Sequence, residues 1–297
     1  MTFQDGKPFA FIALLSAVLL WASSFPVLKL AFEVYDPMVV IFGRMFVASC
    51  CFLLVIRNFR SIDYRKGDWK KLLFMAVCEP GLYFVFEAMA VENSEASQAG
   101  MICAMLPLMV AVGARFCLKE PFSRKTAMGF GLAVVGAIIL SLAAEAKGNA
   151  PNPMLGNFLE FMAMVCATGY MITLKNLSSR YSPWFLTMVQ AFVGTIFFFP
   201  LLFLPGTAPP AGFDLFGAGA ILYLGVFVTI GGYGLYNVGM SKIPAAQASA
   251  FINLIPVFTL LLSWIILGET LNPTQYAACA LVLVGVWYSQ DNSAKNN

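Results

Sequence analysis

Stretches of apolar residues long enough to cross a lipid bilayer follow one another along almost the whole chain. Ten such runs can be placed, each close to the roughly 17–25 residues that a membrane-spanning helix needs. The segments between them are short, so no stretch is left that is long enough for a separate water-soluble domain. We therefore expect an all-α membrane protein. The ten predicted transmembrane helices span 9–31, 37–56, 72–91, 96–118, 126–144, 154–174, 183–204, 214–238, 245–267 and 273–289.

Composition agrees with this class and excludes several functions. Hydrophobic residues make up 60% of the chain and charged residues 11%, against about 25% charged in soluble domains. The chain has no histidine, which removes the commonest general base and metal ligand. Its seven cysteines lie inside apolar runs without a CxxC spacing, as small buried side chains do. We expect no metal, no cofactor and, at a net charge of +3, no nucleic acid as a partner.

Lysines and arginines between the helices predict the orientation, because cytoplasmic loops carry an excess of them. The opposite side has only Lys29 and Lys147. Both termini are therefore expected in the cytoplasm, and the first apolar run is too long for the core of a signal peptide. The basic residues on the side of the termini are Lys7, Arg57, Arg60, Arg65, Lys66, Lys70, Lys71, Arg115, Lys119, Arg124, Lys125, Lys175, Arg180, Lys242 and Lys295.

The second half of the chain repeats the first. Each half holds five helices, an odd number, so the second half enters the membrane from the opposite side. We expect two inverted repeats, 1–147 and 148–297, around a central cavity, an arrangement typical of secondary transporters that bind substrate near the midplane. A shift of 149 residues matches Ala96, Gln98, Pro107 and Glu120 to Ala245, Gln247, Pro256 and Glu269, and a shift of 146 matches Lys29 and Pro37 to Lys175 and Pro183.

Charged residues inside the apolar runs mark a candidate binding site. A charge at the centre of a bilayer costs roughly 2.5–3.5 kcal/mol even on insertion scales. Glu79, Tyr83 and Glu87 are spaced to share one face of the third helix, and the Pro-Gly pair after Glu79 predicts a break in that helix. Arg44 lies inside the second helix. It either holds a substrate carboxylate or pairs with a glutamate.

The eighth predicted helix carries glycines at the matching place, in TIGGYGLYNVG at 229–239. Helix breakers at corresponding places in two halves indicate a transporter's binding site. Trp21 lies in the middle of the first helix, where its ring suits a cavity wall or helix packing. Met101 begins a methionine stripe that either adapts to ligands or packs against other helices. The candidate substrate-binding residues are Trp21, Arg44, Glu79, Tyr83, Glu87, Met101, Tyr233, Tyr236 and Asn237.

The last helix of each half has further features in common with its counterpart. Glu120 and Glu269 stand just before these helices, where we expect them to cap a helix N-terminus and set the loop. Gly129, Gly131 and Gly136 are expected to let the fifth helix pack closely on a neighbour.

These segments also carry a family resemblance. LKEPFSRKTAMGFGLAVVGAIIL at 118–140, LGETLNPTQYAACALVLVGVWYS at 267–289 and LLWASSFPVLKLAF at 19–32 resemble the drug/metabolite transporter superfamily, in its ten-helix EamA branch. Within that branch the chain is most similar to YddG-type aromatic amino acid exporters. The resemblance implies a bacterial inner-membrane protein that exports small organic molecules through a basket-like bundle.

The leading hypothesis is a secondary transporter that exports amino acids, aromatic and other neutral ones, by alternating access. An arginine with glutamates suits their carboxylate and ammonium groups, whereas an excess of acids would suit the alternative cargo of other metabolites or cationic drugs. No phosphate loop is present, so the driving force is expected to be the substrate gradient or proton exchange at Glu79 or Glu87. An enzyme is disfavoured because no nucleophile and base cluster at membrane depth. Ten helices in one chain suggest a functional monomer.

Overall fold

The computed structural model describes residues 7–59, 64–117, 124–242 and 251–289. Within these ranges the chain is helical and forms no β-strand. The helical rods coincide with the predicted ones to within a few residues, and the ninth, predicted from residue 245, is described from Phe251 onward. The α-helices are α1 (Lys7–Phe32), α2 (Pro37–Leu54), α3 (Asp68–Ala76), α4 (Tyr83–Asn93), α5 (Ala96–Ile102), α6 (Leu106–Cys117), α7 (Arg124–Leu142), α8 (Pro153–Leu177), α9 (Pro183–Phe198), α10 (Leu215–Tyr223), α11 (Gly234–Lys242), α13 (Ile255–Leu267) and α14 (Pro273–Ser289).

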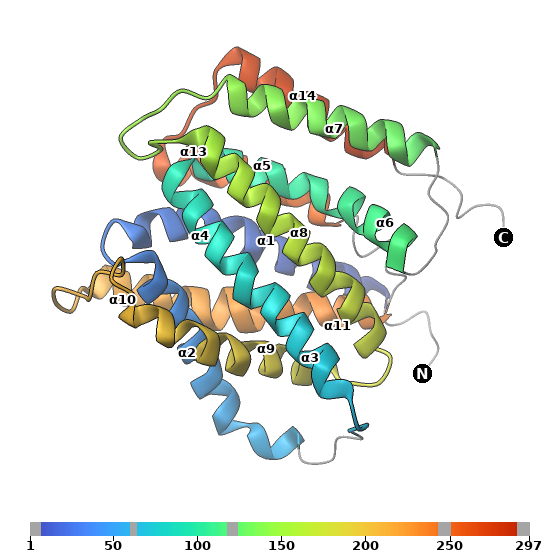
Figure 1. Ribbon diagram of the computed structural model, residues 1–297, viewed down its shortest axis with the longest axis vertical. Coiled ribbons are helices and arrows are strands. Elements are labelled where there is room, and N and C mark those ends of the chain that lie inside the picture. Colours follow the sequence, from blue (N-terminus) through green and yellow to red (C-terminus); the bar gives the residue numbers. More distant parts are fainter. Residues whose placement is uncertain (1–6, 60–63, 118–123, 243–250, 290–297) are drawn as a thin grey trace.

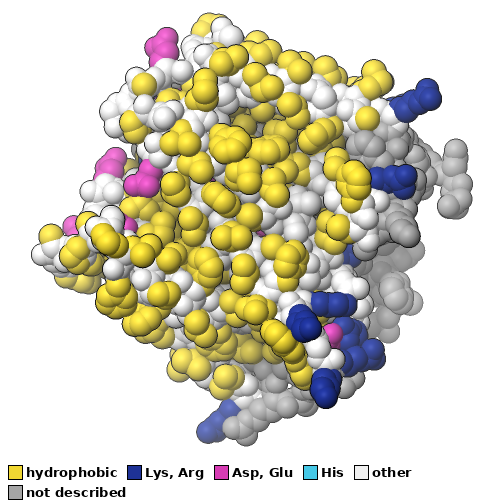
Figure 2. Space-filling view, in the orientation of Figure 1, with side chains coloured by type: hydrophobic (Ala, Val, Ile, Leu, Met, Phe, Trp, Pro, Cys, Tyr) yellow, Lys and Arg dark blue, Asp and Glu magenta, His cyan; other side chains and the backbone are white. Residues whose placement is uncertain are grey.

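Eight rods of the described chain are long and apolar enough to cross a membrane on their own. They are α1, α2, α3–α4, α5–α6, α7, α8, α9 with the 3₁₀ turn after it, and α10–α11. The described part of the ninth rod, Phe251–Leu267, is shorter, and α14 has 17 residues. Figure 2 shows that apolar side chains cover the middle of the surface. The protein is therefore a helical membrane protein, as predicted.

Charged side chains gather at opposite ends of this apolar surface (Figure 2). Most of the lysines and arginines in this view lie at one end and most of the aspartates and glutamates at the other. The positive-inside rule assigns the basic end to the cytoplasm, and this orientation stays a prediction. Exposed residues of the basic end are Arg57, Arg65, Lys66, Lys70, Lys71, Arg115, Arg124, Lys125, Lys175 and Lys242, and those of the acidic end are Glu33, Glu92, Glu145 and Asp214.

Helices α2, α8 and α9 begin in the same way. In each, a polar residue precedes a proline at the first helical position. Asp36, Asn152 and Ser182 each accept a hydrogen bond from a backbone N–H two or three residues further on. Such caps satisfy N–H groups that the helix leaves free, and proline has no N–H to satisfy at that position. The start of each rod is thus fixed locally.

Two rods are interrupted by π-helical segments near their middle. Val77–Leu82 connects α3 to α4, and Leu224–Tyr233 connects α10 to α11. In the first segment, Glu79 has φ −149° and ψ 117°, which is not a helical conformation, and Pro80 follows it. The predicted breaks in the third and eighth helices are therefore confirmed. Segments of π-helix are frequent at functional sites, and both of these border the cavity described below.

Helices α7 and α14 lie against each other along one edge of the bundle (Figure 1). A Cβ atom on Gly136 would lie 2.8 Å from Cγ2 of Val282, and one on Gly285 would lie 2.7 Å from the carbonyl oxygen of Gly129. The absence of side chains therefore permits the close approach that was predicted. Gly131 has no such neighbour within 4 Å, so the prediction that it serves this packing is wrong.

Glu269 caps a helix N-terminus as predicted, and the helix is α5 from the other half of the chain. Its two carboxylate oxygens accept hydrogen bonds from the backbone N–H groups of Ala96 and Ser97, both at 2.9 Å. A carboxylate at this position satisfies two free N–H groups and interacts favourably with the helix dipole. Its predicted counterpart Glu120 lies outside the described residues, as does Gln247.

Candidate functional site

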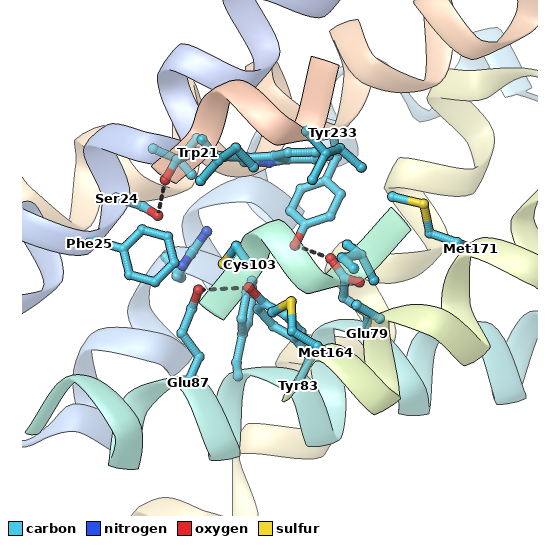
Figure 3. Close-up of a pocket in the computed structure, with 17 residues that line it drawn as sticks. Trp21, Ser24, Phe25, Glu79, Tyr83, Glu87, Cys103, Met164, Met171 and Tyr233 are labelled. Carbon is cyan, nitrogen blue, oxygen red and sulfur yellow. Dashed lines mark hydrogen bonds between the residues drawn. The ribbon is translucent and has the colours of Figure 1, made fainter. Parts of the chain in front are cut away.

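A small cavity lies in the interior of the bundle, where the two interrupted rods meet α1, α2 and α8 (Figure 3). Its volume is about 40 Å³, enough for a few water molecules. Small-molecule sites usually measure roughly 300–1,000 Å³. A small organic molecule therefore requires the surrounding rods to move apart before it can bind.

Most of the predicted binding residues come together here. The three others, Met101, Tyr236 and Asn237, are buried but do not line the cavity, and their role in binding stays a prediction. Met101 belongs to the hydrophobic core. The predicted residues that line the cavity are Trp21, Arg44, Glu79, Tyr83, Glu87 and Tyr233.

Tyr236 and Asn237 support the wall from behind. The ring of Tyr236 lies 4.8 Å from the ring of Trp21 between centroids. Asn237 donates a hydrogen bond to Oγ1 of Thr187 at 3.1 Å and accepts one from the hydroxyl of Tyr170 at 3.4 Å. Both residues are thus one layer behind the lining residues of α1 and of the segment before α11.

Each of the two predicted glutamates accepts a hydrogen bond from a tyrosine (Figure 3). Tyr233 donates to Oε1 of Glu79 at 2.6 Å, and Tyr83 donates to Oε1 of Glu87 at 3.0 Å. The break in the third rod frees the carbonyl of Glu79, and Gln190 donates to it at 3.1 Å. Oε2 of Glu87 is buried and has no hydrogen-bond partner among the described residues. Glu79 is therefore held by two neighbours, whereas Glu87 has an open acceptor.

Arg44 is buried, with 1% of its surface exposed, and its guanidinium is only partly paired. Nε donates to Oγ1 of Thr229 at 3.2 Å. Cζ lies 4.2 Å from the ring centroid of Phe84, within the range of a cation–π interaction. Nη1 has no acceptor, and within the described ranges Arg44 forms no ion pair with a glutamate. Of its two expected roles, the glutamate pair is thus not formed in this conformation.

An aromatic wall faces these charged groups. The ring of Trp21 lies 5.1 Å from that of Tyr233 at an interplanar angle of 62°, a favourable edge-to-face arrangement. Gly232 allows this approach, since a Cβ atom there would lie 2.8 Å from Nε1 of Trp21. That Nε1 is itself buried, and no described residue accepts a hydrogen bond from it. Gly232, one of the glycines at the predicted break in the eighth helix, therefore also leaves room for the ring of Trp21.

Sequence reasoning missed Glu160, a third buried acid next to the cavity. It lies on α8 with no exposed surface, and Cys103 donates to its Oε1 at 3.5 Å. Cys103 itself lines the cavity, so Glu160 lies directly behind the lining. An acid inside a predicted membrane span was the signal that singled out Glu79 and Glu87, and the same signal was available for Glu160.

The lining is also built from residues that correspond between the two halves of the chain. The neutral lining residues come from both halves, whereas the charged ones come from the first half. For example, a shift of 149 relates Glu79 to Val228, which is apolar. No local pattern distinguishes such apolar positions from ordinary core residues. Lining pairs related by shifts of 149 or 146 are Phe84 and Tyr233, Cys103 and Ile252, Leu106 and Ile255, Trp21 and Ala167, and Phe25 and Met171.

Relatives with similar sequences are named as transporters. An uncharacterized transporter of Archaeoglobus fulgidus is 27% identical, covering 93% of this chain and 96% of its own. The uncharacterized transporter YetK of Bacillus subtilis is 25% identical, covering 94% of this chain and 86% of its own. A probable terminal-alkyne amino-acid exporter of Streptantibioticus cattleyicolor is 24% identical, covering 92% and 91%.

A solved crystal structure has the same fold, with a TM-score of 0.64 at 18% identity over 97% of this chain and 96% of that one. The family comparison gives two matches along the chain. Residues 8–142 and residues 154–289 each match the EamA-like transporter family. The two matches together cover most of the sequence, and the relatives are transporters rather than enzymes. The chain therefore belongs to the EamA-like transporter family.

Proposed function

We propose that this transporter exports amino acids, aromatic and other neutral ones, from the cytoplasm by alternating access. The observation that carries the proposal is an unpaired cation and an unpaired anion in one cavity. In the part of the chain that the structure describes, Nη1 of Arg44 has no acceptor and Oε2 of Glu87 has no donor. A free amino acid presents a carboxylate to the first and an ammonium to the second. Both contacts are charge-assisted hydrogen bonds, the stronger kind.

The apolar lining suits the side chain of such a substrate. The rings of Trp21, Phe25 and Tyr233 offer flat apolar surfaces. Met164 and Met171 add flexible side chains, which adapt to ligands of different shape. The relative from Streptantibioticus cattleyicolor, named a probable terminal-alkyne amino-acid exporter, also supports this substrate class.

Alternating access fits the arrangement of the two halves. We take 1–147 and 148–297 as inverted repeats, because corresponding residues line the cavity and both interrupted rods border it. Rocking of one set of rods against the other would open the cavity to one side at a time. With the basic end in the cytoplasm of a bacterial inner membrane, export is movement of the substrate from the basic end of the cavity to the acidic end. Both halves that line the cavity belong to one chain, so a monomer is sufficient for transport.

A second candidate is the export of cationic drugs or other metabolites. It is favoured by the surplus of acid near the cavity, where Glu79, Glu87 and Glu160 are buried beside one arginine, Arg44. The two candidates differ in what they require of Arg44. An amino acid needs a partner for its carboxylate, whereas a lipophilic cation is repelled by a guanidinium.

Counterflow of phenylalanine in proteoliposomes of the purified protein tests the proposal. Arg44→Ala should lose roughly tenfold to a hundredfold in apparent affinity, because a charged hydrogen bond contributes about 1.5–3 kcal/mol. Arg65→Ala, at the exposed basic end, is the matched control and should leave counterflow unchanged. Uptake of tetraphenylphosphonium should not fall in Arg44→Ala. If no amino acid exchanges while the phosphonium ion does, the second candidate replaces the first.

A further inference from the structure

We propose that Glu160 is the proton-binding residue of this transporter and that substrate bound at Glu87 drives the proton off it. The proposal rests on the amino-acid transport proposed above and identifies its coupling site. Glu160 lies outside the cavity lining, behind Cys103. It can therefore hold a proton without touching the substrate.

The hydrogen bonds of the three buried acids differ. Glu79 and Glu87 each accept from a tyrosine hydroxyl. Among the described residues, Glu160 accepts only from the thiol of Cys103 at 3.5 Å, and its Oε2 has no partner. A thiol is a weak donor, and an ionised carboxylate out of water needs strong donors or a cation. Of the three acids, Glu160 is thus the one whose ionised form is least stabilised by its neighbours, and the one that gains most from binding a proton.

The described charged and titratable groups that face Glu160 include no lysine or arginine. Glu87 and Tyr83 face it from α4, and Cys103 faces it from the turn before α6. No lysine or arginine in the described segments forms an ion pair with it. Arg44 interacts with Glu87 and Glu79 and is not among the groups that act on Glu160. Glu160 and Glu87 are therefore neighbouring buried acids, and like charges so placed disfavour each other.

This neighbourhood couples substrate to proton. When a substrate ammonium occupies Oε2 of Glu87, the negative charge of Glu87 is compensated and no longer disfavours an ionised Glu160. The O–H bond of Glu160 then breaks and the proton leaves to the side from which the substrate entered. After the substrate departs on the other side, Glu160 takes up a proton there. Such reciprocal coupling gives exchange of one amino acid for one proton.

The repeat offers no structural reason for an acid at this position. A shift of 146 relates Glu160 to Leu14, which is also fully buried. An apolar side chain thus fills the corresponding place in the other half of the bundle. The acid is specific to α8, the helix that packs against α4 and its π-helical segment.

The test uses the full-length protein in proteoliposomes. Phenylalanine counterflow is measured without a pH gradient, and phenylalanine accumulation is measured with one. Glu160→Gln should keep counterflow and lose the response to the gradient. Glu92→Gln, which removes an exposed acid at the end of α4, is the matched control and should keep both. A gradient response retained in Glu160→Gln would overturn the proposal.

A second measurement is independent of transport. Infrared difference spectra of the lipid-embedded protein between acidic and alkaline buffer should show the C=O band of a protonated buried carboxyl, and Glu160→Gln should lose it. If that variant does not fold, Cys103→Ala should shift the same band, because it removes the thiol that donates to Glu160. Carboxyl bands unchanged in both variants would overturn proton binding here. Absence of counterflow in the wild type would instead refute the transport proposal and leave the infrared result to decide on Glu160.

Discussion

The hydroxyl of Tyr233 donates a 2.6 Å hydrogen bond to Glu79, a residue 154 positions earlier in the chain. Both residues lie in π-helical segments, so the bond joins the two interrupted rods beside the cavity. Glu79 also receives a hydrogen bond on its carbonyl from Gln190. Any movement that separates these rods to admit a substrate must break the bond to Tyr233.

Removing this hydroxyl should weaken the closed bundle. Tyr233→Phe loses a hydrogen bond to an acid, which contributes about 1.5–3 kcal/mol, so its melting temperature in detergent should fall. Tyr236→Phe is the matched control, because within the described ranges that hydroxyl donates only to the sulfur of Met171, at 3.8 Å. An equal fall in both variants would contradict the special position of Tyr233.

Lys29 holds the end of another helix. It is 6% exposed, and its ammonium donates to the carbonyls of Val91, at 2.7 Å, and of Ser94, at the C-terminus of α4. Lys29→Met preserves the length of the side chain but leaves these carbonyls unpaired and removes a cation from the negative end of the helix dipole. We expect a loss of about 1–3 kcal/mol, measured by thermal unfolding. Lys66→Met, at an exposed lysine, should unfold like the wild type, and a similar loss there would refute the explanation.

The contact between α7 and α14 should be sensitive to a single methyl group. In Gly285→Ala the new Cβ atom would lie 2.7 Å from the carbonyl of Gly129, and backbone cannot move aside as a side chain can. We expect a loss of about 1–3 kcal/mol. Gly131→Ala, with open space around it, should instead be neutral or gain up to about 1 kcal/mol from helix propensity. Thermal unfolding of the two variants side by side distinguishes these outcomes, and equal stability would argue against the contact.

One ion pair at the acidic end should depend on pH. Lys147 lies 2.5 Å from Glu95, which raises the pKa of Lys147 above its ordinary value. Its stabilising effect is complete below the ordinary pKa of about 10.4 and is lost as the pH rises through the raised value. Because 48% of the lysine side chain is exposed, Lys147→Gln should cost only about 0.2–1 kcal/mol at neutral pH. The difference in melting temperature from the wild type should vanish in strongly alkaline buffer, and a difference that persists there would exclude this cause.

The positions of the rods follow from the sequence because lipid permits few alternatives. A backbone inside a bilayer must satisfy its own hydrogen bonds, so each long apolar run becomes one helix. The α8 rod, Pro153–Leu177, extends the predicted range 154–174 by one turn at most. The interruption at Glu79 was also predictable, since proline removes a donor and clashes with the preceding turn.

The sequence predicted cavity residues mainly where a charged side chain interrupts an apolar run. Arg44 and Glu87 are charged residues inside apolar runs, so the sequence identified them. It did not identify their hydrogen-bond partners, and only the structure shows that Arg44 is not paired with a glutamate of the described segments. Met164 and Ile252 line the cavity as ordinary apolar residues. Which apolar face looks inward depends on how the rods rotate against each other, and that is a property of the whole bundle. Met101 illustrates the converse, because it was singled out by a conspicuous stripe and packs in the hydrophobic core of this conformation, while its role in binding stays a prediction.

The π-helical segment Val77–Leu82 controls more than local geometry. An α-helix turns by about 100° per residue, so a deletion that converted this segment to regular α-helix would rotate everything after it by that amount. Tyr83 and Glu87 would then leave the cavity for another face of the bundle without any change in their own sequence. The alignment of polar groups across this membrane thus depends on the number of residues in a stretch, and the exact count there is constrained as strictly as the identity of the glutamates.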